Sequence, residues 1–288
     1  MKEKHAMHAV NGQKRPAYFN LFEVLALLLA LLLYVIPFYF VLINSFKTKR
    51  EAGLMNISWP SSLQIVENYR EVITANRYAL LVAFKNSILI TAFSLLLMIL
   101  VCSMAGFILQ RRRDKLATIS NFVLLTGLMI PPAIVPTIWV MQTIGIYKTL
   151  HGMVLIEVAL NCSFSCILYR GFMGSIPREI DEAAVIDGCG SWGVYFRIIM
   201  PLLRPVTATV IVLSTINIFN DFVNPMYFLP GTRNITVQQT LYNFSGKYTS
   251  DYNLLFADVM LITIPPLLLF IFFNKQIVSG MVAGAIKG

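Results

Sequence analysis

The chain has 288 residues, of which 57% are hydrophobic and 13% charged, and its mean hydropathy is +0.70. One soluble core of this length cannot bury so much apolar surface, which excludes an ordinary soluble domain and indicates an integral membrane protein. The formal net charge of +9 does not indicate a nucleic-acid partner. The basic residues flank apolar stretches instead of forming one stripe with interleaved aromatic residues.

Apolar stretches of the length that a helix needs to cross a membrane, roughly 20 residues, recur along the chain. Six are expected, near Leu21–Ile43, Asn86–Leu109, Ile119–Met141, Met153–Tyr169, Val206–Val223 and Leu254–Phe273. The first is longer than the hydrophobic region of a signal peptide, so it is expected to remain as a helix. The sequence therefore predicts an all-α membrane protein with six transmembrane helices.

Lysine and arginine gather before the first span, in the short loop 111–115 and in the region 170–204. The positive-inside rule places these segments, and both termini, in the cytoplasm, although Lys47, Lys49 and Arg50 depart from it. The expected order is a cytoplasmic segment (1–20), the first transmembrane helix (21–43), an extracytoplasmic loop of short helices (44–85), a membrane core (86–274) with a cytoplasmic loop at 175–201, and a cytoplasmic tail (275–288).

Proline interrupts the third predicted span. Pro131, Pro132 and Pro136 each remove a backbone hydrogen bond, so this span is expected to be kinked or locally unwound. Such breaks are tolerated where the freed carbonyl groups face protein or a water-filled cavity, which makes Pro131 and Pro132 candidates for a pathway wall. An ordinary kinked packing helix is the alternative.

The four cysteines show no metal-binding pattern in the sequence. Cys102, Cys162 and Cys166 lie in apolar spans and Cys189 lies in a loop. Cys162 and Cys166 share a helix face, but no histidine or carboxylate pattern accompanies them. The sequence predicts small buried thiols and no metal site.

A polar, helix-forming run, EIDEAAVIDGCGSWGVYFRIIMP, extends from Glu179 to Pro201 between two apolar spans. Ser175 is expected to cap its first helix, and Gly188 and Gly190 offer a left-handed exit. Ser191 is expected to cap a second short helix that ends before the proline. The pattern predicts a helix, a turn and a helix along the cytoplasmic face.

The first of these helices has the features of a docking helix. Glu182 and Ile186 are four residues apart and share a face, and Ala183 and Ala184 leave the backbone accessible to a partner. An ordinary amphipathic linker helix is the alternative.

The same run resembles the EAA loop of bacterial ABC importer permeases, in the spacing of Glu182, Ala183, Ala184, Asp187, Gly188, Ile198 and Pro201. Further matches extend the resemblance over nearly the whole chain and narrow it to the MalG-type permeases of carbohydrate importers. They are Trp59-Pro60, Asn68-Tyr69, Asn220-Asp221-Phe222 and the small-residue ending Gly280–Gly288. The chain departs from the family pattern at Cys189, where alanine is usual, and at Met200, where leucine is usual.

The resemblance implies a type I ABC importer permease fold, with a permease core over 86–274 and its coupling loop at 175–201 seated in an ATPase subunit. It implies docking to that ATPase through Glu182, Ala183, Ala184, Ile186, Asp187, Gly188 and Pro201. It also implies that the tail at Gly284, Ala285 and Lys287 reaches toward the ATPase dimer; a merely flexible small-residue tail is the alternative.

The implied partners are a homologous second permease subunit, an ATPase dimer, an extracytoplasmic sugar-binding protein and the lipid of a bacterial inner membrane. The chain has no G-x-x-x-x-G-K-[ST] phosphate loop. A non-catalytic subunit is therefore expected, with no cofactor of its own and with ATP and Mg bound by the partner ATPase.

Polar residues inside predicted spans are costly to bury, so each is a functional candidate. Glu157 and Asn161 lie one turn apart in the fourth span, and Asn217, Asn220 and Asp221 gather near the outer end of the fifth. These groups are suited to bind a hydroxyl-rich sugar, and they are equally suited to bond neighbouring helices.

The function expected from these observations is ATP-driven import of sugars, oligosaccharides in particular, by alternating access. An ABC permease for glycerol phosphate or another non-sugar solute is one alternative. An ion-driven secondary carrier is another, and a requirement for a separate ATPase separates it from the first two.

Overall fold

The computed structural model describes residues 17–246 and 250–285. This part of the chain is helical and contains no β-strand, which confirms the predicted all-α class. Its elements are α1 (Ala17–Ser45), α2 (Lys49–Ala52), α3 (Ile65–Arg111), α4 (Lys115–Met129), α5 (Ile134–Thr143), α6 (Leu150–Met173), α7 (Glu179–Ile186), α8 (Ser191–Gly193), the π-helix η1 (Val194–Ile199), α9 (Met200–Leu202), α10 (Arg204–Phe219), α11 (Val223–Phe228), the 3₁₀-helix η2 (Val237–Asn243) and α12 (Tyr252–Ala285).

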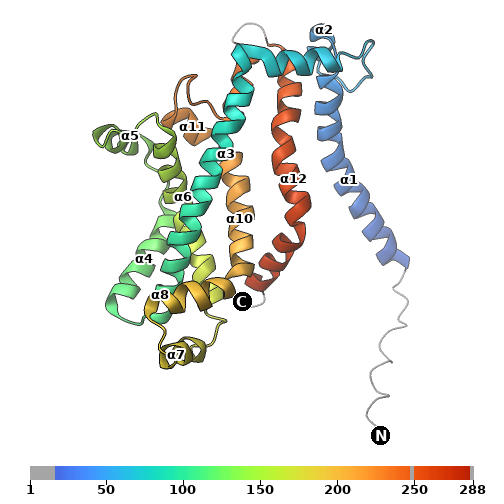
Figure 1. The fold of residues 1–288 in the computed structure, drawn as a ribbon. Helices are drawn as coiled ribbons and strands as arrows, with labels where there is room; N and C mark the ends of the chain where they lie inside the picture. The colour runs from blue at the N-terminus through green and yellow to red at the C-terminus, as the bar shows by residue number, and fades with distance from the viewer. Residues whose placement is uncertain (1–16, 247–249, 286–288) are drawn as a thin grey trace.

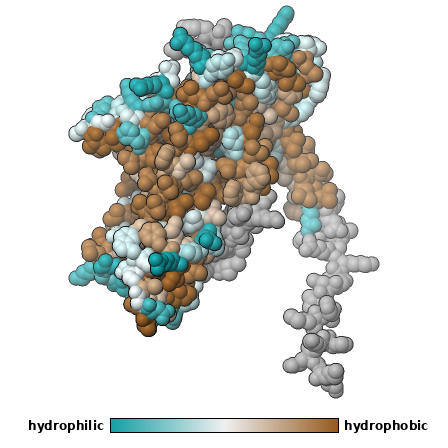
Figure 2. All heavy atoms as spheres, in the orientation of Figure 1, coloured by the Kyte–Doolittle hydropathy of each residue, from teal (hydrophilic) through white to brown (hydrophobic). Residues whose placement is uncertain are grey.

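Four of the described helices are long and apolar enough to cross a membrane: α1, α3, α6 and α12. Two further pairs qualify together but are bent, by 118° between α4 and α5 and by 71° between Ser191–Leu202 and α10. There are six spans if each bent pair is one span, as the sequence predicts. Hydrophobic atoms form a band between two more polar ends in Figure 2, as expected for a bundle embedded in lipid.

The long helices lie side by side in the order α3, α10, α12 and α1, with α6 packed against α3 and α4 against α6 (Figure 1). Short helices cover the two ends of the bundle. We call the end that carries α2 the α2 end, and the end that carries α7, together with the last residues of α3 and α6, the α7 end.

Helix α3 turns sharply at Ala75–Tyr78, where Asn76, Arg77 and Tyr78 have φ of 49°, 59° and 62°. Its first arm lies across the α2 end and its second arm runs down the bundle (Figure 1). Part of the segment expected as an external loop is therefore a helix continuous with the second span. Left-handed backbone at non-glycine residues is costly, so tertiary contacts must hold this corner.

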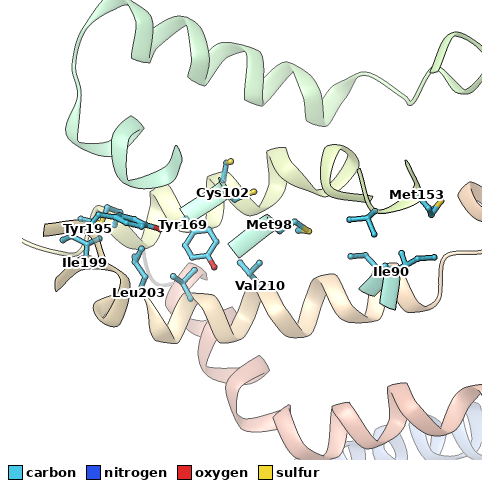
Figure 3. Close-up of a cluster of buried hydrophobic side chains, with 14 of the residues drawn as sticks. Ile90, Met98, Cys102, Met153, Tyr169, Tyr195, Ile199, Leu203 and Val210 are labelled. Atoms are coloured by element: carbon cyan, nitrogen blue, oxygen red, sulfur yellow. The ribbon is translucent and has the colours of Figure 1, made fainter. Parts of the chain in front are cut away.

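The main core lies between α3, α6 and the helices that follow α7, as Figure 3 shows for its buried side chains. Gly106 of α3 lies directly against α6. A Cβ atom at this position would be 2.6 Å from Cβ of Tyr169 and 2.9 Å from N of Arg170. The glycine thus permits the close approach of the two helices.

At the α2 end, the buried side chains of Lys47 and Asn68 are hydrogen-bonded within the chain itself. The Lys47 ammonium donates to the Asn44 side chain (3.1 Å) and to both oxygens of Asn56 (2.8 Å each). The Asn68 amide donates to the Ser45 and Lys47 carbonyls (2.9 Å each). Burial lowers the pKa of Lys47, and the Glu51 carboxylate opposes this shift. We call this group of residues the α2 corner.

Candidate docking loop and polar cluster

The first helix of the candidate docking loop, α7, begins without a side-chain cap. Arg178 occupies the cap position and makes no capping bond. The predicted cap at Ser175 is wrong, because its hydroxyl donates to the Phe172 carbonyl (2.6 Å). Serine often bonds back to the preceding helical turn, and here that local bond closes the end of α6 instead.

The turn after α7 depends on one left-handed glycine. Gly188 has φ of +84°, which confirms the predicted left-handed exit, whereas Gly190 has φ of −69°. No atom lies within 4 Å of the position that a Cβ would take at either glycine. Backbone conformation, and not space, therefore requires glycine at 188.

The second helix of the loop continues through Pro201 instead of ending before it, so that prediction is wrong. Gly190, and not Ser191, takes the cap position, and the helical run extends to Leu202. Pro201 lies in the first turn of α9, a position where proline is compatible with a helix. The chain bends after this run, before α10 begins.

One face of α7 packs against the rest of the chain. Ala184 is buried in the main core, with Ile180, one turn earlier, packed against the same cluster. The expectation that Ala183 and Ala184 together leave the backbone open to a partner therefore holds for Ala183 alone, which is exposed. A 3.6-residue period places these adjacent residues on different faces.

The opposite face of α7 is exposed and carries two of the predicted docking residues, Glu182 and Ile186; Asp187 and Gly188 follow in the turn, and Pro201 lies in α9. Glu182, Ile186 and Asp187 are exposed, and Ile186 is 85% accessible. Val185 adds a second exposed apolar side chain on α7. Figure 2 shows hydrophobic atoms among polar ones at this end of the molecule. An exposed apolar group bordered by charges is typical of a protein contact surface.

Arg111, the last residue of α3, attaches α7 to the bundle. Nε of its guanidinium pairs with the Asp181 carboxylate, and Nη2 donates a second bond to the same carboxylate (3.3 Å). Nη1 and Nη2 also donate to the Ile176 carbonyl (3.1 Å each). The two side chains are only 14% and 17% exposed. The sequence showed Arg111 only as one charge in a basic loop, because its partner lies 70 residues away.

A second link joins the loop to α3. Tyr195, in the π-helix after α7, is buried and its hydroxyl hydrogen-bonds Ser103 of α3. Its ring lies 5.9 Å from the ring of Phe107, centroid to centroid. With Arg111, this contact ties both helices of the loop to the last turns of α3. The exposed face of α7 is therefore joined, through these two contacts, to a helix that runs the length of the bundle (Figure 1).

Three of the predicted pathway residues come together between α6 and the end of α10. Glu157 is buried, and its carboxyl group interacts electrostatically with that of Asp221. Asn161 donates to the Glu157 carbonyl (2.9 Å) and carboxylate (3.5 Å). Oε1 of Glu157 has no hydrogen-bond partner among the described residues. This polar cluster can therefore accept one more donor group.

The other predicted pathway residues lie apart from these hydrogen bonds. Asn217 and Asn220 are exposed on and after α10, and Asn220 accepts a bond from Gln238 (3.3 Å). Pro131 and Pro132 are exposed in the break between α4 and α5, which confirms the predicted interruption of the third span.

The predicted ATPase-contacting tail is only partly described. Gly284 and Ala285 close the backbone of α12. Lys287 lies outside the described residues.

Comparison with known proteins agrees with this architecture. The family described as binding-protein-dependent transport system inner membrane component matches residues 98–283. The "Probable starch degradation products transport system permease protein AmyC" of Thermoanaerobacterium thermosulfurigenes is 33% identical over 258 residues, which cover 89% of this chain and 93% of that protein. The melibiose/raffinose/stachyose import permease protein MelC of Bacillus subtilis (strain 168) is also 33% identical, over 88% of this chain and 91% of that protein.

A solved bacterial ABC transporter that imports the acidic polysaccharide alginate has the same fold. Its matching chain superposes with a TM-score of 0.77 at 18% identity, covering 90% of this chain and 96% of that chain. The family match covers more than half of the sequence. It includes the segment 175–201 that carries α7, which we call the α7 loop, and the last turns of α3 to which this loop is bonded. The chain therefore belongs to the family of binding-protein-dependent transport system inner membrane components.

Proposed function

We propose that this chain is one of two membrane subunits of an ATP-driven importer of sugars, oligosaccharides in particular, in a bacterial plasma membrane. The relatives named for starch degradation products and for melibiose, raffinose and stachyose support the cargo class. The observation that carries the mechanism is the two-sided α7, which is braced to α3 on one face and exposed on the other.

In this proposal the α7 end faces the cytoplasm, and α7 docks into an ATPase subunit. Glu182 pairs with a basic residue there, and Ile186 fills an apolar depression. ATP and Mg are bound, and ATP is hydrolysed, by that partner. Closure of two ATPase subunits moves α7, and the links through Arg111 and Tyr195 pass the movement to α3. The bundle then alternates between inward-facing and outward-facing states.

The cargo path runs between this chain and a second, homologous permease. The cluster of Glu157, Asn161 and Asp221 offers carboxylate and amide groups that suit sugar hydroxyls. An external sugar-binding protein delivers the cargo at the α2 end. The tail at Gly284, Ala285 and Lys287 reaches the ATPase dimer.

The test of this proposal compares two glutamates on α7. Glu182 and Glu179 are both exposed. We expect Glu182→Ala to reduce binding of the purified ATPase subunit and uptake of radiolabelled maltooligosaccharide in proteoliposomes that contain the full complex. Glu179→Ala is expected to retain both activities. Equal activities in the two variants would contradict the assignment of Glu182.

Cargo class is tested separately. Binding of the cognate external protein to a glycan panel, compared with glycerol phosphate, distinguishes a sugar importer from a permease for a phosphorylated solute. The ion-driven carrier is disfavoured, because the family to which the chain belongs depends on a binding protein. Uptake that persists without the ATPase subunit would restore that alternative.

A further inference from the structure

The fold brings together three cysteines that the sequence leaves apart. Cys102 lies on α3, and Cys162 and Cys166 lie on successive turns of α6. Sγ of Cys162 is 3.7 Å from Sγ of Cys102 and 3.8 Å from Sγ of Cys166, and all three sulfur atoms lie within 4.8 Å of one another. Figure 3 shows Cys102 among the side chains of the main core. We call this group the cysteine triad.

These distances match a metal site. Ligand sulfur atoms at about 2.3 Å from a metal are about 3.8 Å apart in tetrahedral and about 4.0 Å apart in trigonal geometry. The two measured separations of the triad, 3.7 and 3.8 Å, are close to this range. An ion could therefore be bound with small rotations of the thiols and little movement of the helices.

Close packing of α3 against α6, next to the triad, fixes the positions of the two helices that carry the three cysteines. Gly106 lies one turn beyond Cys102 and permits α3 to touch α6 at Tyr169. Cys102 and Cys166 are buried and Cys162 is half-buried. The sulfur atoms thus have a fixed arrangement before any ion binds, which reduces the entropic cost of binding.

We propose that the cysteine triad binds one soft monovalent cation of the Cu(I) type. Thiol sulfur selects soft ions, and the group contains no carboxylate or imidazole among its possible ligands. Zn²⁺ prefers four protein ligands in a closed site, whereas this group supplies three. The three thiol sulfur atoms, at these separations, can surround one soft monovalent ion, and the loss of any one of them leaves the ion with an incomplete set of ligands.

Charge favours the same class of ion. A net charge in the interior of a membrane bundle is costly. When a monovalent cation binds three neutral thiols and one thiol releases its proton, the site contains one thiolate, two thiols and one positive ion. The net charge is then zero. Binding therefore releases one proton per ion and joins α3 to α6 through the metal.

The experiment uses Ag(I) as a stable probe for Cu(I), with the full-length chain in detergent and chloride-free buffer. Cys189, outside the triad, would add a separate thiol, so Cys189→Ser is the starting protein. We expect it to bind one Ag(I) per chain, to release one proton per ion and to unfold at a higher temperature when loaded. Adding Cys102→Ser is expected to weaken binding at least tenfold and to abolish the thermal shift.

Cys162→Ser in the same background is a second variant, in case the buried Cys102 position does not tolerate serine. It is expected to weaken Ag(I) binding by a similar factor. Three Ag(I) per chain, or affinity unchanged in both variants, would show independent thiols and overturn the proposal. Sugar uptake in the Cys189→Ser protein without metal measures the transport function independently.

Discussion

The α2 corner and the α7 loop both contain charged residues at an end of the bundle (Figure 1), but their polar groups differ in whether they are bonded within the chain. In the α2 corner, Lys47 and Asn68 are buried and bonded to the same chain. In the α7 loop, Glu182 makes no side-chain bond within the described chain, and Ile186 is almost fully exposed. Groups satisfied internally stabilise the fold, whereas groups left free are available to a partner.

This difference predicts two classes of variant. Changes in the α2 corner should lower the stability of the folded chain and leave transport per folded molecule unchanged. Changes on the exposed face of α7 should lower transport per folded molecule and leave the stability of the folded chain unchanged. The ion pair between Arg111 and Asp181 lies at the boundary between these classes, since it joins the docking helix to the bundle.

The largest effect is expected for Arg111→Ala. The change leaves the Asp181 carboxylate poorly solvated and unpaired, at a cost of about 3 kcal/mol, and frees α7 from α3. We expect loss of most sugar uptake in proteoliposomes. Arg112→Ala is the matched control, because Arg112 is more exposed and pairs with Asp114 two residues away. Equal uptake in the two variants would show that the brace is dispensable.

Next in size is Asn68→Ala in the α2 corner. It removes the bonds to the Ser45 and Lys47 carbonyls and the bond donated by Asn253 (2.8 Å). Buried groups left unsatisfied should lower the free energy of unfolding by about 2–3 kcal/mol, measured by thermal unfolding. Glu67→Ala, at the exposed neighbouring position, should leave stability unchanged. Reduced uptake per folded molecule in Asn68→Ala would contradict the expectation that the α2 corner contributes to stability alone.

Gly188→Val should cost about 1–3 kcal/mol, because valine resists φ of +84°. The strain is expected to displace α7 and to weaken binding of the ATPase subunit in a pull-down. Gly190→Val is the control, since Gly190 has φ of −69° and open space around its Cβ position. If both variants bind normally, the turn does not position the docking helix.

The smallest effect on stability is expected for Ile186→Ala. The side chain is 85% exposed, so the free energy of unfolding should change by less than about 0.5 kcal/mol. Burial in a partner would nevertheless make it important for affinity, and we expect about tenfold weaker ATPase binding, equivalent to about 1.4 kcal/mol. Leu54→Ala, at an exposed apolar position of the α2 end, should leave that affinity unchanged. If Leu54→Ala weakened ATPase binding as much as Ile186→Ala, the loss would not be specific to the exposed face of α7.

Local patterns predicted many features correctly. The apolar stretches located the spans, the prolines located the break before α5, and Gly188 located the turn after α7. The caps predicted at Ser175 and Ser191 were wrong, since other local hydrogen-bonding and backbone choices compete at helix ends. Such choices depend on how the flanking helices are placed.

The sequence by itself determined that this is a helical membrane protein with a polar, glycine-closed loop between two spans, because hydrophobic length and backbone preference are local properties. Only the tertiary structure decided that Ala184 faces the core, that Arg111 meets Asp181 and that Cys102 meets the two cysteines of α6. These contacts join residues far apart in the chain. They depend on how helices pack against one another, which helical periodicity does not specify.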